Sequence, residues 1–303
     1  MKKFLKWTGI TLGGLVGLLL IAGIVIYFGT DARLTKKYEI GVKPFTLYSD
    51  SSTVAAGRQL GNGVAVCTHC HGDDLGGKVV IDAPVGFVAA PNITSGEGSV
   101  VRNFKDSDWV RVLHHGVAPD GRPVVIMPAE DYQNLSIEEI NALVSWVKSM
   151  PPVNRPSPPS SFTMLGRVLF AFGVLPKLPA EVIDHNAPIP PTAVPGVNPA
   201  YGRHLALTAG CIGCHGPTLS GGQIPGTPPD WPAAANISQD ATTGIGTWSE
   251  ADFIRALREG KRPDGRTLDT LMPWKNTRLM KDDDLRALYL YLKTIPAKPF
   301  GGR

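Results

Sequence analysis

The longest apolar stretch of the chain lies at its N-terminus. An uncharged run extends from Trp7 to Thr30, and its centre, Gly9–Phe28, has the length of about 20 residues that a helix needs to cross a bilayer. The apolar region of a cleaved signal peptide is shorter, about 7–15 residues, and no clear small-residue cleavage site follows this run. We therefore expect residues 1–30 to be an uncleaved membrane anchor and residues 31–52 to be a spacer.

After the spacer, apolar residues recur at helical spacing in several short segments. Start and stop signals accompany them: Ser136-Ile137-Glu138-Glu139 has the form of a capping box, and Pro151-Pro152 ends the segment that it opens. The pattern predicts helices over residues 53–66, 106–116, 136–151 and 249–260, and a last helix that has its apolar stripe at residues 285–292 and ends near Pro296. We read the chain as all-α, with several short helices in each of two units.

The two units are copies of each other. Asn92-Ile93-Thr94 recurs as Asn236-Ile237-Ser238, at an offset of 144 residues. The turn Pro119-Asp120-Gly121-Arg122 recurs with identical sequence as Pro263-Asp264-Gly265-Arg266, at the same offset. An internal repeat of this kind indicates two copies of one domain. We place the first domain at 53–151 and the second at 196–303.

A connector of residues 152–195 joins the two units. The stretch from Pro151 to Pro199 contains 12 prolines, so most of it should be extended or irregular. An apolar island, Phe162–Leu178, interrupts it, too short and too broken by Arg167 and Pro176 for a second membrane span. It could be a helix that packs back on the two domains, or an interfacial helix that lies on a bilayer or on a membrane partner.

Composition and charge narrow the possible partners. The chain has 30 Lys and Arg against 26 Asp and Glu, and three of the lysines precede the apolar N-terminal run. The rest is close to neutral, which gives no support to a nucleic-acid partner. The 34 glycines and 27 prolines favour a fold with many loops.

The four cysteines carry the clearest chemical signal. They occur as Cys67-Thr68-His69-Cys70-His71 and, 144 residues later, as Cys211-Ile212-Gly213-Cys214-His215. A zinc site, a redox dithiol and a disulfide framework also use such pairs, but the pairs lie far apart and each is followed directly by histidine. This is the attachment signature of haem c: two thiols bind the porphyrin, and the histidine, His71 or His215, binds iron. We expect two covalently bound haem c groups.

A second axial ligand is suggested by a Met-Pro pair in each unit. Met127-Pro128 and Met272-Pro273 lie 56 and 57 residues after the haem-motif histidines. A thioether suits iron in both oxidation states, and the proline stiffens the loop. We predict Met127 and Met272 as the second ligands.

The other histidines and two arginines receive weaker interpretations. His114 and His115 align with Arg258 and Glu259, so we expect them on the surface. His69, His185 and His204 do not look like ligands. Arg122 and Arg266 could meet haem propionates, although arginines on a surface turn explain them more simply.

With these motifs, the chain resembles class I c-type cytochromes in a membrane-anchored dihaem form. The second unit, with Gly244-Ile245-Gly246-Thr247-Trp248-Ser249-Glu250 and the Pro263–Arg266 turn, is similar to cytochrome c subunits of bacterial membrane-bound alcohol and aldehyde dehydrogenases. The best-known members carry three haem motifs, and this chain carries two. Lysines lie on both sides of the apolar run, so the positive-inside rule hardly distinguishes between its two possible orientations in the membrane. Because haem c is attached outside the cytoplasm in this family, the resemblance implies a single-pass protein of the bacterial inner membrane with its haem domains on the periplasmic side.

The resemblance implies an electron carrier rather than an enzyme. Such a protein passes electrons between a dehydrogenase or quinol-linked donor and a respiratory acceptor, for example a terminal oxidase. The alternative is a dihaem peroxidase, which needs one open iron with acid/base groups beside it. Two Met-Pro loops in register argue against that alternative, and a purely structural anchor would leave the repeated ligands unexplained.

Overall fold

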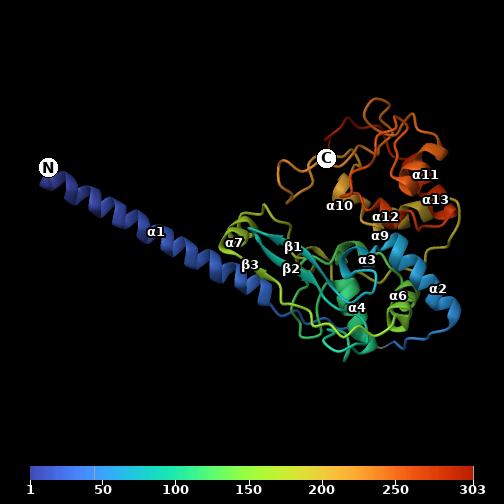
Figure 1. Ribbon diagram of the computed structural model, residues 1–303, viewed down its shortest axis with the longest axis horizontal. Helices are drawn as coiled ribbons and strands as arrows, with labels where there is room; N and C mark the ends of the chain where they lie inside the picture. Colours follow the sequence, from blue (N-terminus) through green and yellow to red (C-terminus); the bar gives the residue numbers. More distant parts are fainter. Residues whose placement is uncertain (44, 303) are drawn as a thin grey trace.

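The computed structural model describes residues 1–43 and 45–302. Its first element, α1 (Lys2–Thr35), is a long helix that projects from the rest of the molecule (Figure 1). Thr30 of α1 is buried, whereas most of the large apolar side chains of this helix are exposed. By length and composition, α1 is the one helix of the described residues that could cross a membrane. It continues five residues into the segment that the sequence assigned to a spacer, to Thr35.

The first unit contains five α-helices and one short π-helix. They are α2 (Ser51–Gln59), the π-helix η1 (Leu60–Val64), α3 (Cys67–His71), α4 (Asp106–His115), α5 (Ala129–Tyr132) and α6 (Ile137–Ser149). The predicted capping box is confirmed, because Ser136 Oγ accepts from Glu139 N at 3.2 Å and Glu139 Oε2 accepts from Ser136 N at 2.9 Å. Gly116, with φ of +64°, ends α4 in the left-handed conformation that favours glycine.

The second unit repeats this order. It contains α9 (Pro199–Thr208), α10 (Cys211–His215), α11 (Glu250–Glu259), α12 (Trp274–Thr277) and α13 (Asp282–Leu292). The first and last helices pack on each other in both units. A Cβ on Gly57 of α2 would lie 1.8 Å from the carbonyl oxygen of Ala142 in α6, and one on Gly202 of α9 would lie 1.9 Å from that of Ala287 in α13. The two glycines let the backbones meet.

Two apolar clusters form the cores of the two units. The first contains Trp109, Ile140 and Trp146, and the second contains Leu205, Phe253 and Leu285, all buried. Leu60 packs against both clusters, so the cores adjoin. Figure 1 shows the units side by side, with α1 leaving from the first.

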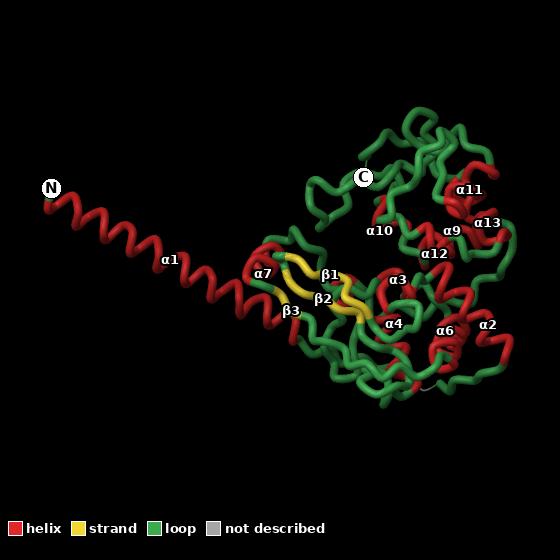
Figure 2. Tube along the Cα trace, viewed as in Figure 1, coloured by secondary structure: helices red, strands yellow, loops and turns green. Residues whose placement is uncertain are grey.

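The chain is mostly helical, but the all-α expectation is wrong in one place. Strands β1 (Lys78–Ala83), β2 (Gly86–Ala90) and β3 (Ser161–Phe162) form an antiparallel sheet in the order β1-β2-β3. The sheet lies near α7 (Met164–Ala171) (Figure 2). It forms because the connector returns to the first unit: Gly86 pairs with Phe162, and a Cβ at Gly86 would lie 2.4 Å from the oxygen of Ser161. A last short helix, α8 (Pro179–Val182), follows α7.

Candidate haem sites

Each cysteine motif forms a single helical turn with the same entry and exit. α3 begins after Val66 and α10 after Gly210, both left-handed with φ of +44° and +69°. Both turns end at a glycine of positive φ, Gly72 at +82° and Gly216 at +80°. In a helix, residues three and four apart lie on one face. The two cysteines and the histidine of each motif therefore share one side of their turn.

The cysteine side chains form no disulfide. Burial raises the pKa of the Cys67 and Cys211 thiols to about 12, which opposes the thiolate that a reactive dithiol requires. In the part of the chain that the structure describes, no three Cys, His, Asp or Glu side chains are grouped as a metal site would need. The zinc and dithiol alternatives therefore gain no support.

The motif histidines are held in the same way in both units. The Nδ1 atom of His71 lies 2.8 Å from the carbonyl oxygen of Pro91, and Nδ1 of His215 lies 2.7 Å from that of Ala235. A carbonyl can only accept, so Nδ1 carries the proton and the lone pair is on Nε2. Burial also lowers the pKa of His71, which keeps its imidazole neutral. A neutral ring fixed through Nδ1 is the usual arrangement of a metal-binding histidine.

Sequence reasoning missed these two carbonyl groups, although a signal for them existed. Each directly precedes one copy of the repeated Asn motif. Asn92 is fully buried and donates from Nδ2 to the oxygen of Val153 at 2.6 Å, and Asn236 donates to that of Lys298 at 2.8 Å. The repeated asparagines thus fix the loops whose carbonyls orient the histidines. The repeat could have indicated this support.

The two predicted methionines occupy equivalent places. Met127 packs against the same apolar cluster as Cys67, and Met272 packs against the cluster that includes Cys211. The loops also match, because Ala129 N donates to Met127 O at 2.8 Å and Trp274 N donates to Met272 O at 2.7 Å. Each methionine is half-buried at the start of a short helix, α5 or α12, with proline as the capping residue.

The surroundings fit a large apolar group that also carries acceptor oxygens. In the first unit Leu75, Val110 and Leu143 are buried around Cys67 and Met127. The indole N–H groups of Trp109 and Trp274 are buried without an acceptor. A porphyrin supplies an apolar body and two carboxylates, so the residues present fit haem.

The interpretation of His114 and His115 as surface residues is wrong. Both are buried, with 1% and 7% of their surface exposed, and His115 Nδ1 lies 3.3 Å from His185 Nδ1. The connector is the reason: α8 lies against the end of α4, where a Cβ on Gly116 would meet Pro179 at 2.9 Å. The repeat could not show this, because the segment that covers the two histidines belongs to the connector and lies outside the repeated part of the chain.

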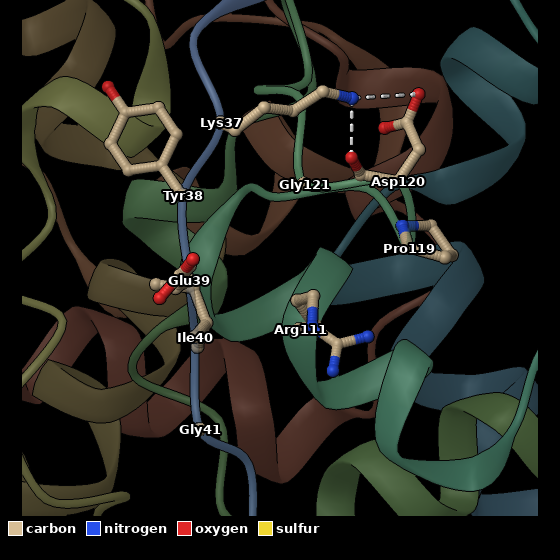
Figure 3. Close-up of a pocket in the computed structure, with 9 residues that line it drawn as sticks. All are labelled: Lys37, Tyr38, Glu39, Ile40, Gly41, Arg111, Pro119, Asp120 and Gly121. Carbon is tan, nitrogen blue, oxygen red and sulfur yellow. Dashed lines mark hydrogen bonds and ion pairs between the residues drawn. The ribbon is translucent and has the colours of Figure 1, made fainter.

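Arg122 and Arg266 lie on exposed turns. Arg122 Nε donates to Asp120 at 2.5 Å, and Arg266 Nε donates to Asp264 at 2.8 Å. These contacts agree with the interpretation of both arginines as residues of a surface turn. The Asp120 turn also borders a groove that contains no Cys, His or Met, where Lys37 Nζ donates to Asp120 O (Figure 3). The hydrogen bond from Lys37 holds the spacer against the first unit.

The two units contact each other in a way that the sequence did not predict. Asp131 and Asn276 each lie four residues after the predicted methionine of their own unit. Asn276 Nδ2 donates to Thr68 Oγ1, inside the first cysteine motif, at 3.0 Å. Asp131 packs against the second motif, where a Cβ on Gly210 would lie 2.5 Å from its Oδ2. Each methionine loop therefore contacts the cysteine motif of the other unit.

Sequence comparisons relate the chain to cytochrome c and to cytochrome subunits of dehydrogenases. The cytochrome c family model matches residues 199–296. The chain is 27% identical over 271 residues to the cytochrome c subunit of the quinone-dependent alcohol dehydrogenase of Gluconobacter oxydans, covering 80% of this chain and 54% of that protein. It is 38% identical over 267 residues to the gluconate 2-dehydrogenase cytochrome c subunit of Pantoea cypripedii, covering 77% and 57%.

A dihaem c-type cytochrome of Cereibacter sphaeroides is 24% identical over 265 residues, covering 76% of this chain and 82% of that protein. The chain spans about half the length of the curated dehydrogenase subunits that it matches. The motifs, their matched geometry and these similarities lead to one conclusion: residues 199–296 match the cytochrome c family, and the chain as a whole is similar to the cytochrome subunits of bacterial dehydrogenases.

Proposed function

We propose that this chain is a dihaem electron carrier. In the proposal, Cys67 and Cys70 hold one haem c through thioether bonds, and Cys211 and Cys214 hold the other. The observation that carries the proposal is the twofold occurrence of one arrangement: a cysteine turn, a histidine fixed through Nδ1, and a Met-Pro loop against the same apolar cluster. If the arrangement occurred once, core packing could explain it. Because it occurs in both units, we infer that each unit binds the same kind of group.

In this proposal His71 and Met127 bind one iron, and His215 and Met272 bind the other. When bound, the haem supplies a one-electron iron couple. The chain holds each histidine in one orientation, and each methionine directly precedes a proline that stiffens its loop. These features keep ligand movement small between the two oxidation states, and burial together with the thioether ligand favours a raised reduction potential.

The contacts between the units support electron transfer within the chain. Asn276 joins α12 to the first cysteine motif, and Asp131 joins α5 to the region of the second. The two proposed haem sites therefore share one interface. An electron accepted by one unit would pass to the other without leaving the protein.

We propose the residues 53–151 and 196–303 as two tandem class I cytochrome c domains, joined by residues 152–195. In the proposal α1 is an uncleaved anchor in the bacterial inner membrane, with both haem domains on the periplasmic side. The relatives are named as cytochrome subunits of dehydrogenases. By analogy, a dehydrogenase or a quinol-linked complex would supply the electrons, and a respiratory complex would accept them.

The haem count tests the proposal. The full chain, produced in a host that matures c-type cytochromes, should contain two haems per chain that remain bound after denaturation. Replacement of both cysteines of one motif, Cys67→Ala with Cys70→Ala, should leave one. The matched pair Cys211→Ala with Cys214→Ala should leave the other, with a different reduction potential. Porphyrin that is extracted completely from the denatured protein would refute covalent attachment.

A further inference from the structure

Several apolar side chains on and after α7 are exposed to solvent. Met164 and Leu165 in its first turn are 48% and 49% exposed, and Phe172 and Val174 just after it are 75% and 52% exposed. The other side of the helix is buried through Gly166 and Phe170. We call the four exposed residues the α7 patch. A soluble surface gives no reason for four large apolar side chains within 11 residues.

One arginine of α7 binds the last apolar turns of α1. Arg167 Nη1 donates to Tyr27 O at 3.1 Å and to Thr30 Oγ1 at 2.9 Å. Its guanidinium also lies over the Tyr27 ring, 4.1 Å from the centroid. The Arg167 side chain is mostly buried, with 11% exposed. α7 is therefore fixed beside the end of the apolar run of α1.

A second arginine, from α1 itself, completes the contact. Arg33 donates from Nε and Nη2 to the two oxygens of Glu181 in α8, both at 2.7 Å. The same guanidinium lies 3.8 Å from the centroid of Phe170. A bidentate pair of this kind has a defined geometry. Together the two arginines make α1, α7 and α8 one rigid corner.

This corner places the α7 patch at a definite level along α1. Arg167 meets α1 at Tyr27–Asp31, and Phe170 meets it at Arg33, so α7 follows α1 in the same direction. Met164 and Leu165 precede Arg167 and thus lie level with the last apolar turns of α1. Figure 1 shows α7 at the place where α1 enters the rest of the molecule. Phe28 and Ile24 of α1 are also exposed.

We propose that the α7 patch inserts into the surface layer of the bilayer that α1 crosses, beginning with the first turn of α7, and that this contact sets the orientation of the first unit. This inference rests on the anchoring role in the proposed function. Lipid is the favoured occupant because Met164 and Leu165 lie level with the last apolar turns of α1, where Ile24 and Phe28 are also exposed. A stable protein interface uses about 20–30 residues on each side, many more than the patch offers.

Photochemical labelling by lipid tests the proposal. The full-length cytochrome would be reconstituted into vesicles of phosphatidylcholine and phosphatidylglycerol that include a phosphatidylcholine with a diazirine on its acyl chain. After irradiation, peptide mass spectrometry locates the adducts. We expect adducts in α1 and in residues 164–174. Val194 and Leu271, also exposed and apolar but distant in sequence from α1, serve as internal controls and should remain unlabelled.

A variant sharpens the test. Leu165→Glu with Phe172→Glu changes two exposed positions, so the haem absorbance should match that of the unchanged protein. Labelling of residues 164–174 should fall several-fold, while labelling of α1 stays the same. Adducts in α1 with none in residues 164–174 of the unchanged protein would overturn the inference and leave anchoring intact. Absence of adducts from α1 as well would count against both.

Discussion

Met127 and Met272 show how a repeat changes the meaning of one residue. A lone half-buried methionine is usually a flexible packing residue. Here both methionines directly precede the proline that caps a short helix, and each packs against the same apolar cluster as the first cysteine of its own motif. The paired positions support the proposal that both methionines bind iron. Met280, which is buried in the second core, has no counterpart of this kind.

Met272→Ala should remove one axial ligand. We expect the reduction potential of the second haem to fall by on the order of 0.1 V, within the range of about 0.8 V that axial ligands span. The iron should also bind carbon monoxide. Potentiometric titration and absorbance spectra under carbon monoxide measure both effects. Met280→Leu is the control and should change neither; an unchanged potential in the alanine variant would exclude Met272 as a ligand.

Asp131 is a second residue with a defined role. Burial raises the pKa of its carboxyl to about 7, and the charge of Glu130 adds to the shift. Above that pH the carboxylate is ionised beside Gly210 and the second motif. A negative charge stabilises ferric haem relative to ferrous haem. We therefore expect the potential of the second haem to fall as pH rises through about 7.

Asp131→Asn should flatten this pH dependence. Redox titrations between about pH 5 and pH 9 measure it. The first unit is a built-in control, because the equivalent neighbour of its motif is the neutral Asn276. A pH dependence that survives the substitution would assign the titration to another group.

At the scale of elements, the contact between the first and last helices organises each unit. Gly57 against Ala142 and Gly202 against Ala287 are the same contact made twice. The sequence contains the pair Gly57-Arg58 and repeats it as Gly202-Arg203, but it does not indicate which residues the two glycines contact. Helices that approach this closely depend on the absence of a single side chain.

Gly202→Ala should force α9 away from α13, because the new methyl group would lie 1.9 Å from a carbonyl oxygen. We expect a loss of stability of about 1–3 kcal/mol or more. Thermal unfolding followed by circular dichroism would show it as a lower Tm. Gly41→Ala, where a Cβ meets nothing within 4 Å, is the control. Equal Tm values for the two variants would contradict the close contact.

The whole molecule is held together by contacts across the two units. Asn276 donates to Thr68 at 3.0 Å, and His204 Nε2 lies 2.7 Å from Glu139 Oε1. Gln59 Nε2 also donates to the oxygen of Leu279 at 2.5 Å. These bonds join residues that are between 65 and 220 positions apart. They align two units that could otherwise move separately on a long connector.

Asn276→Ala should weaken this alignment by about 1 kcal/mol, the typical value of one hydrogen bond. We expect slower electron transfer between the two haems, measured after rapid reduction of one of them. Asn186→Ala, at an exposed position of the connector, should leave the rate unchanged. An unchanged rate for Asn276→Ala would separate the hydrogen bond from the electron route.

The sequence by itself determined the parts that depend on local patterns. These are the apolar N-terminal helix, the capped helices such as α6, the two cysteine turns and their repetition at 144 residues. Caps and helical spacing act within a few residues, and a duplicated motif is visible without its surroundings. The sequence also named the cysteines, histidines and methionines of the two proposed haem sites.

Only the tertiary structure decided what lies against what. It buried His114 and His115 under α8, paired β2 with β3, and brought Asp131 and Asn276 to the opposite cysteine motifs. It also set α7 beside the end of α1. These contacts join distant residues through backbone carbonyls and packing surfaces, which leave no periodic trace in the chain. These contacts form because they stabilise the folded chain together, so no single segment of the sequence determines them.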